Sequence, residues 1–311
     1  IRIMRRLEIT GSIMFRNMRL YRLTGDWPVS EEELSNQLLN LPFKPCGAFT
    51  ERSAGWEAPV AELPEVLARR VAGADLVRLR SQRRLLPAAA VHGALEERVA
   101  EFGDRMGRPP GRKEKRDLKD EIHAELMPKA LLKSDRIWGM YIRSERVLAV
   151  DTASETQADR FTDALRSAFG SLPMTPIEFK APLAKLLTSI VLGQGPTSFL
   201  PGRECRMLDP STGSSSVSWL DIDLADPSVQ KHVRDGLKLD RLAVSFDEVA
   251  SLVIDQDCVI RKLKLIGMEK VEDGDALDED PIGLQDAEFV LTAGVITRLL
   301  GALKKQLGGY E

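Results

Sequence analysis

Two helix-forming stretches separated by only five residues most constrain how this chain can fold. Residues 88–106 place their large apolar side chains in one narrow sector of a helix: Val91, Leu95, Val99, Phe102 and Met106. The segment GRPPG at 107–111 stops that helix. Residues 112–126 form a second helix with its apolar row in the distal half: Leu118, Ile122 and Leu126. A loop this short predicts an antiparallel helical hairpin.

The second helix carries four cations on one face. Arg112, Lys115, Arg116 and Lys119 follow the spacing i, i+3, i+4, i+7, and we call them the basic stripe. Like charges four residues apart cost a helix roughly 0.2 to 0.5 kcal/mol per pair, so the stripe does not serve helix stability. A polyanion is its natural partner, and duplex DNA offers about one phosphate charge per 1.7 Å of axis.

The charge pattern of this helix admits two interpretations. Acidic side chains lie on the side away from the basic stripe, as a directed contact requires: Glu114, Asp117, Glu121 and Glu125. Because the cations crowd the half of the helix that lacks apolar residues, the tip should project beyond the core. The alternative is a solvated face, because Lys113 with Asp117 and Arg116 with Asp120 are opposite charges four residues apart.

The composition limits any nucleic-acid contact to a local surface. The 311 residues are 43% apolar and 29% charged, with a net charge of −3 and 5% aromatic residues. Such a chain is globular, is long enough for two or three structural units, and is not a polycation as a whole. Its tryptophans do not cluster with cations, so we expect phosphate contact without base stacking.

Other features predict a cytoplasmic chain. Cys46, Cys205 and Cys258 are widely spaced and are interpreted as reduced thiols. We find neither 18 consecutive apolar residues nor a secretory leader, and therefore expect no membrane span and no export. Met14 is interpreted as the true start, which makes residues 1–13 an extension outside the fold.

Strand and helix patterns elsewhere are mixed without strict alternation, which favours an α+β fold over a doubly wound sheet. We expect mixed sheets flanked by helices, with the hairpin as a projecting arm. The expected units are a central α+β region (14–86 and 132–180), the helical arm (87–131) and a C-terminal α+β base region (181–311). The expected elements are strands at 15–23, 75–86, 137–142, 146–150 and 173–179, helices at 30–40 and 154–169, up to three short strands within 239–265, a polar loop at 209–218, an acidic loop at 269–288, and a strand followed by a helix within 287–307.

The residue pattern does not predict catalysis, a metal site or a cofactor. The three histidines share no ligand spacing with one another or with the cysteines. The segment GQGPTS at 193–198 lacks the lysine of a phosphate loop. Asp221 and Asp223 would share one face of a strand, which is usually the wet side of a sheet. Glu178 with Lys180 has a spacing that nucleases use around Mg²⁺, yet several carboxylates would have to converge there. We therefore expect a protein that is not an enzyme.

Two further basic surfaces are candidates for phosphate contact. Arg83 and Arg84 lie near the end of the strand expected at 75–86. Lys262 and Lys264 alternate with apolar residues and would point together from a strand. For these lysines the alternative is an exposed sheet edge guarded against aggregation.

Segments spread along the whole chain carry a family resemblance. They are FRNMRLYRLT, KPCGAFTERSAGWEAP, RRLLPAAAV, DLKDEIHAELMPKA, LRSAFGSLPMTP, DRLAVSFD, IRKLKL, and DAEFVLTAG with LGG. In this order, over residues 14–309, they resemble the RdgC family of recombination-associated proteins. The resemblance implies a bacterial, nucleoid-associated homodimer that closes into a ring around duplex DNA, binds with little sequence preference, and restrains RecA indirectly through competition for DNA.

The resemblance also assigns residues. The family's basic arm and its Pro-basic-Ala ring contact match Arg108, Arg112, Lys115 and Lys119, and Pro128, Lys129 and Ala130, respectively. This chain departs from the family at Leu131, where an aromatic residue is usual. A second departure precedes Asp223, where the family tends to carry a basic pair and this chain reads Trp219, Leu220 and Asp221.

Residues and resemblance together predict sequence-nonspecific binding of double-stranded DNA by a ring-forming homodimer that limits RecA action. A protein-interaction scaffold, whose arm docks an acidic partner, is the alternative. The predicted DNA-binding residues are Arg83, Arg84, Arg105, Arg108, Arg112, Lys113, Lys115, Arg116, Lys119, Lys262 and Lys264, and the predicted dimer-interface residues are Pro128, Lys129, Ala130 and Leu131.

Overall fold

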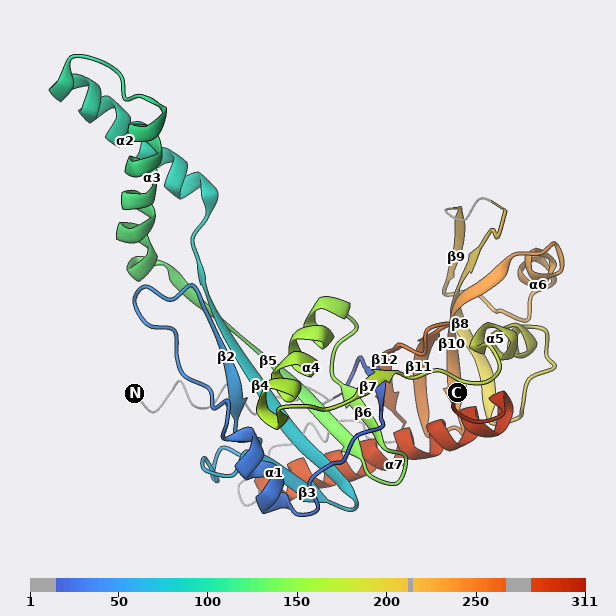
Figure 1. The fold of residues 1–311 in the computed structure, drawn as a ribbon. Coiled ribbons are helices and arrows are strands. Elements are labelled where there is room, and N and C mark those ends of the chain that lie inside the picture. Colours follow the sequence, from blue (N-terminus) through green and yellow to red (C-terminus); the bar gives the residue numbers. More distant parts are fainter. Residues whose placement is uncertain (1–14, 212–214, 267–280) are drawn as a thin grey trace, which may run out of the picture.

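The computed structural model describes residues 15–211, 215–266 and 281–311. Within them the chain forms two antiparallel sheets packed against helices, which confirms the expected α+β class (Figure 1). The expected extension at 1–13 lies outside the described residues.

The first sheet has the strand order β2-β4-β5-β6-β1-β7, with β3 paired to β4. Strands β4 and β5 pair in unbroken register from Ala74 opposite Ile142 to Leu85 opposite Leu131. This long ribbon extends past the core and leads into the arm (Figure 1). The strands are β1 (Arg19–Leu23), β2 (Arg52–Glu57), β3 (Ala68–Val71), β4 (Ala74–Leu85), β5 (Leu131–Ile142), β6 (Val147–Val150) and β7 (Met174–Pro176).

The second sheet has the strand order β12-β11-β10-β8-β9. Three of its strands fall within 239–265 to within a residue, as predicted. Its strands are β8 (Phe199–Leu208), β9 (Ser216–Leu220), β10 (Lys238–Phe246), β11 (Ala250–Asp255) and β12 (Ile260–Leu265). The helices of the chain are α1 (Glu31–Leu38), α2 (Ala88–Met106), α3 (Arg112–Leu126), the 3₁₀ turn η2 (Met127–Lys129), α4 (Glu155–Phe169), α5 (Leu183–Val191), α6 (Pro227–Arg234) and α7 (Pro281–Leu307).

Helix α1 begins where its sequence predicts. The Ser30 hydroxyl accepts a hydrogen bond from the Glu33 backbone N–H at 3.0 Å, and the Glu33 carboxylate accepts one from the Val29 N–H at 2.9 Å. These bonds satisfy N–H groups at the start of the helix that no helical turn can reach. Leu34 and Leu38 then lie buried against the first sheet.

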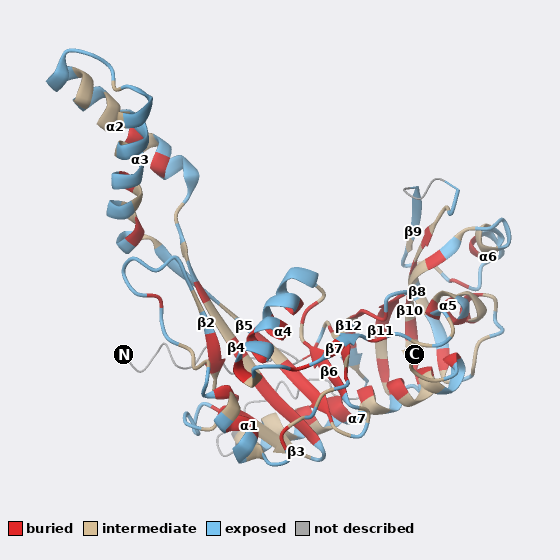
Figure 2. Ribbon diagram, viewed as in Figure 1, coloured by how far each residue is buried: buried red, intermediate tan, exposed pale blue. Residues whose placement is uncertain are grey.

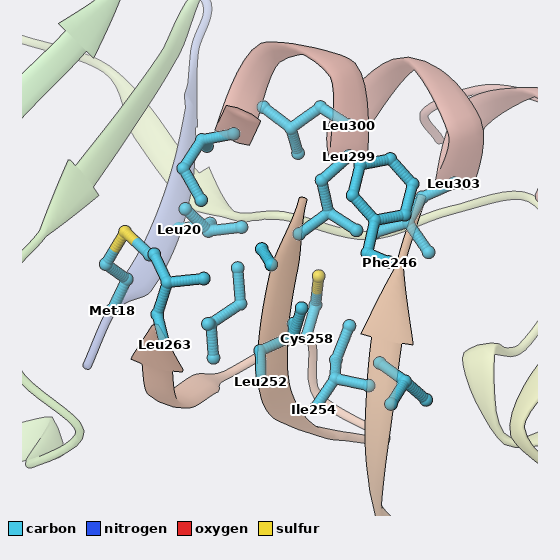
Figure 3. Close-up of a cluster of buried hydrophobic side chains, with 14 of the residues drawn as sticks. Met18, Leu20, Phe246, Leu252, Ile254, Cys258, Leu263, Leu299, Leu300 and Leu303 are labelled. Carbon is cyan, nitrogen blue, oxygen red and sulfur yellow. The ribbon is translucent and has the colours of Figure 1, made fainter. Parts of the chain in front are cut away.

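The largest core joins the two sheets through α7, which runs beneath both of them (Figure 1). Met18 and Leu20 pack there with side chains of the second sheet and with Leu299, Leu300 and Leu303 of α7 (Figure 3). Met18 also exchanges two backbone hydrogen bonds with Ile260 at 2.8 and 2.9 Å. The edge of β12 is therefore covered by the chain segment that precedes β1, so β12 is not the exposed edge considered for Lys262 and Lys264.

A second core fills the opposite face of the first sheet, under α1 and α4. Phe161 of α4 lies edge-on to Trp56, with ring centroids 5.2 Å apart. It fits because residue 139 is glycine, where a Cβ atom would lie only 2.2 Å from the Phe161 ring. This close approach fixes α4 on the sheet.

Several element predictions were wrong. Helix α7 is continuous over Pro281–Leu307, so the acidic loop cannot extend to 288 and no strand occurs after 287; residues 269–280 lie outside the described part. The polar segment 209–218 ends in strand β9, and helices α5 and α6 were not predicted. Asp221 and Asp223 follow β9 in a turn, where Asp221 has φ 55°.

The arm has little core of its own. Helices α2 and α3 pack on each other through three buried side chains, Val91, Leu95 and Ile122. Most of the arm is exposed, as the pale blue ribbon in Figure 2 shows. Met106, predicted to face inward, is 52% exposed at the end of α2. Among the described helices, none is both long and apolar enough to cross a membrane.

Candidate nucleic-acid interface

The tip of the arm is closed by one ion pair. The Arg108 guanidinium donates two hydrogen bonds of 2.8 Å to the two carboxylate oxygens of Glu114. Glu114 also accepts from the Gly111 backbone N–H at 2.7 Å, and the Arg108 guanidinium lies 5.5 Å from the centre of the Phe102 ring. The pair ties the loop to the first turn of α3, so Arg108 is neutralised in the free protein.

The cations of the basic stripe are in a different state. Arg112, Lys115, Arg116 and Lys119 are all exposed, and within the described residues none of them forms an ion pair. Lys113 is likewise exposed, and the alternative pairs with Asp117 and Asp120 are not formed. Moving a hydrated, unpaired cation from water to a DNA phosphate costs little free energy, because no ion pair within the protein has to break.

The predicted cation Arg84 holds the arm to the sheet. Its guanidinium donates to the carbonyl oxygens of Pro128 at 3.1 Å, of Ala130 at 3.2 Å and of Gly47 at 3.0 Å. A guanidinium has five N–H donors in a fixed fork, which suits it to several carbonyls at once. We therefore assign Arg84 a structural contact at the base of the arm.

The predicted interface segment lies at the same place. Pro128 and Lys129 form the turn η2, and the Lys129 ammonium lies 3.3 Å from the Glu125 carboxylate. Leu131 opens β5 and is 77% exposed, the largest exposed fraction of any described leucine. Among the residues that the structure describes, none covers this leucine, which leaves it free to contact another chain.

The arm also rests on the loop before β2. A hollow of about 270 Å³ separates them, lined by Phe49, Glu51, Asp120, His123, Ala124 and Met127. The His123 imidazole lies 3.9 Å from the Glu51 carboxylate across it. In the described part of the chain, no group of three or more His, Cys, Asp or Glu side chains is arranged to hold a metal ion.

The remaining predicted cations are scattered. Arg105 is exposed on α2, with its guanidinium 6.0 Å from the Phe102 ring centre. The Lys262 ammonium lies 2.6 Å from the Glu204 carboxylate, whereas Lys264 is exposed. A register shift in β12 and the positive φ of Lys262, 53°, break the alternation that was expected to align the two lysines.

The carboxylates of Asp221 and Asp223, considered above for catalysis, have local structural contacts. The Asp221 carboxylate accepts from the Arg203 guanidinium at 2.7 Å, and Asp223 accepts from the Ala225 N–H at 2.9 Å. They are not on one face of a strand, because β9 ends at Leu220. The GQGPTS segment follows α5 as a turn, with Gly195 packed against Ile190.

Sequence reasoning missed two cations near the arm. Strand register places Arg52 of β2 and Lys133 of β5 directly opposite Arg83 of β4, on either side of it. All three side chains are exposed. Pairing register was the missing information, since the residues are up to 81 positions apart in the sequence.

The chain is similar over nearly its whole length to proteins of one family. The family model described as "Putative exonuclease, RdgC" matches residues 13–310. A protein of Shewanella oneidensis named Recombination-associated protein RdgC is 29% identical over 298 residues, which cover 96% of this chain and 98% of that protein. A protein of Pseudoalteromonas atlantica with the same name is 28% identical over 284 residues, covering 91% and 94% of the two chains. The resemblance found in the sequence is thereby confirmed.

Proposed function

Because the chain belongs to the RdgC family, whose members are recombination-associated proteins, we propose that it binds double-stranded DNA without sequence preference, as a ring-forming homodimer that limits the action of RecA. The observation that carries the proposal is the basic stripe on α3: four exposed cations, unpaired within the described residues, on an arm that projects from the core.

The stripe suits phosphate better than bases. Long, mobile ammonium and guanidinium groups on an exposed helix face can follow a charged backbone, and such contacts carry no sequence information. Binding releases the counterions condensed on DNA, so the logarithm of affinity should fall with the logarithm of salt concentration by about 0.9 for each phosphate contacted. Four to six contacts per subunit would give a steep dependence.

Ring closure would make dissociation of the protein from DNA slow. Individual phosphate contacts break quickly, but release of an encircled duplex requires an interface between two chains to open. The segment Pro128–Leu131 supports this step, since it holds an exposed leucine beside a turn fixed by Arg84. A dimer that occupies duplex DNA in this way would restrict RecA by competition.

Binding without catalysis is part of the proposal. One family description names an exonuclease, whereas the names of the relatives describe association with recombination. The carboxylates considered for catalysis have structural partners instead, since the Arg203 guanidinium engages Asp221 and a turn N–H engages Asp223. Incubation of end-labelled linear DNA with Mg²⁺ and the protein should leave the label full length, and shortening of the label would overturn this part.

The stripe itself is tested by changing Arg112, Lys115, Arg116 and Lys119 together to Ala. Affinity for duplexes of unrelated sequence should fall, and the salt slope should become less steep by about 0.9 for each lost contact, up to about 3.6. Fluorescence anisotropy over a range of salt concentrations measures both. An unchanged slope would remove the arm from DNA binding and would favour the scaffold, which should keep an acidic protein partner at salt concentrations that release DNA.

A further inference from the structure

The end of the first sheet that carries the arm has two chemically different faces. Under α4 the sheet is covered by a core in which Trp56, Leu79 and Ile137 lie side by side on β2, β4 and β5. Toward the arm the three strands continue and the ribbon is largely coloured exposed or intermediate (Figure 2); on this same face Arg52, Ala54, Arg83 and Lys133 are exposed. This part of the sheet therefore offers an open surface beside the arm.

On that face a line of three cations crosses the strands. Arg52, Arg83 and Lys133 are direct cross-strand partners, so all three side chains lie on the face that holds Leu79 further along. We call them the cation row. Neighbouring strands are about 4.8 Å apart, so the row spans roughly 10 Å. Like charges directly opposite each other destabilise a sheet, so strand pairing gains nothing from this arrangement.

In the part of the chain that the structure describes, little neutralises the row. The Lys133 ammonium lies 3.3 Å from the Asp135 carboxylate, two residues further along β5. Within the described residues, Arg52 and Arg83 form no ion pair. On the same face the next cross-strand partners are the small residues Ala54 and Ser81, followed by Asp135 on β5, so the sugar-phosphate backbone of DNA could approach the row most closely over β2 and β4.

The opposite face of the same ribbon uses its cations internally. Glu57 lies 3.3 Å from the Arg80 guanidinium and 2.7 Å from that of Arg136, and Arg84 donates to three backbone carbonyls. The Gln82 side chain accepts a hydrogen bond from the Cys46 backbone N–H and donates one to the Ser134 hydroxyl. The unpaired charge is therefore confined to one face, which general solubility does not explain.

We propose that the cation row binds phosphates of the same DNA duplex that the basic stripe contacts. The inference rests on the proposed function and adds a second contact surface to it. The row lies two residues before the end of β4, which leads into α2 through Leu86 and Pro87. At about one phosphate charge per 1.7 Å of duplex axis, a row 10 Å wide meets more than one phosphate.

A triple substitution tests the row: Arg52→Gln, Arg83→Gln and Lys133→Gln. The salt slope of duplex binding should become less steep by about 2 to 3. The matched control is Lys231→Gln, Lys238→Gln and Lys305→Gln, which removes the same charge from exposed positions on α6, β10 and α7. Equal slopes for the triple variant and this control would overturn the inference. The proposed function would still stand if the wild type binds DNA and the stripe variant shows a less steep salt dependence. It fails if the wild type does not bind DNA.

Crosslinking provides a second test that does not depend on the triple variant folding. Ala54→Cys places a thiol on the face of the row, and Ser134→Cys places one on the opposite face. The native cysteines are buried, so a photo-crosslinker attached through maleimide should label the new thiol selectively. Crosslinks to duplex DNA are expected from residue 54 and not from residue 134. Equal crosslinking from both, or crosslinking from residue 134 alone, would contradict the assignment.

Discussion

Arg108 and Glu114 meet through two parallel hydrogen bonds of 2.8 Å at the tip of the arm, where a free cation had been expected. The Arg108 guanidinium, together with the Gly111 N–H, lowers the pKa of Glu114 to about 2. At neutral pH both members of the pair are ionised. Arg108 therefore offers no net charge to a ligand unless its ion pair with Glu114 breaks.

The first prediction follows from this pair. Glu114→Gln should release Arg108 and make the salt slope of DNA binding steeper by up to about 1, whereas Arg108→Gln should change it little. Arg108→Gln with Glu114→Gln is the control, since it removes both charges. Anisotropy titrations measure all three, and a large loss of slope in Arg108→Gln alone would show that the pair opens on binding.

A second prediction concerns the base of the arm. Arg84→Gln removes donors to Gly47, Pro128 and Ala130; because these hydrogen bonds are exposed or only partly buried, water can replace the donors and each lost bond should cost about 0.5 to 1.5 kcal/mol. Amide hydrogens of α3 and η2 should exchange faster with solvent, because the arm then loses its attachment. Arg83→Gln is the matched control on the adjacent position, and it should leave exchange unchanged. Identical exchange in the two variants would refute the structural assignment of Arg84.

The arm shows how far sequence alone can lead. Periodicity located both helices and the exposed cations, because helix contacts are local and follow from spacing. Periodicity predicted a buried Met106 because a helical wheel gives the direction in which a side chain points. It does not show how far along α2 the partner helix α3 extends. The relation of Arg52 to Arg83 and Lys133 was invisible, since it depends on strand pairing over long sequence separations.

The same limit explains the errors in the second sheet. Helices α5 and α6 have nine and eight residues, and neither begins with the capping box that identified the equally short α1. Asp221 and Asp223 were assigned to a strand because LDIDL alternates like one, yet the chain turns at Asp221. Tertiary contacts such as that between Arg203 and Asp221 decide the outcome there.

A third prediction tests the packing of α4. Gly139→Ala places a methyl group 2.2 Å from the Phe161 ring, and overpacking of this kind typically costs about 1 to 3 kcal/mol. The control is Gly301→Ala in α7, where no described atom outside the adjoining helix backbone lies within 4 Å of an added Cβ, and the helix should gain about 0.5 to 1 kcal/mol. Urea unfolding measures the free energy of unfolding of both variants. A value for Gly139→Ala equal to that of the wild type would show that α4 shifts freely to accommodate the methyl group.

A fourth prediction concerns pH. Burial raises the pKa of Asp151 to about 6, against the opposing effect of hydrogen bonds from the Phe15 and Asn17 N–H groups. In the unfolded chain the group titrates near 3.8, so between these values the native state binds more protons and stability falls as pH rises. Asp151→Asn should flatten this dependence between about pH 4 and 6 and should stabilise the protein at pH 7 by at most about 3 kcal/mol. The urea unfolding midpoint, measured across that pH window, tests this prediction. If Asp151→Asn keeps the wild-type pH dependence, Asp151 is not the source of that dependence.

The last prediction addresses ring closure at Leu131, which is 77% exposed beside the turn that Arg84 fixes. Leu131→Asp should weaken contact between two copies, because an ionised carboxylate resists removal from water. Initial affinity for short linear duplexes should change little, since no phosphate contact is lost. On relaxed circular DNA the wild type should resist a high-salt wash and the variant should be released. Leu131→Phe is the informative companion, since a larger apolar side chain should lengthen retention. Wild-type protein that leaves circular and linearised DNA at the same rate would mean that the duplex is not encircled, whatever the basic stripe contributes to affinity.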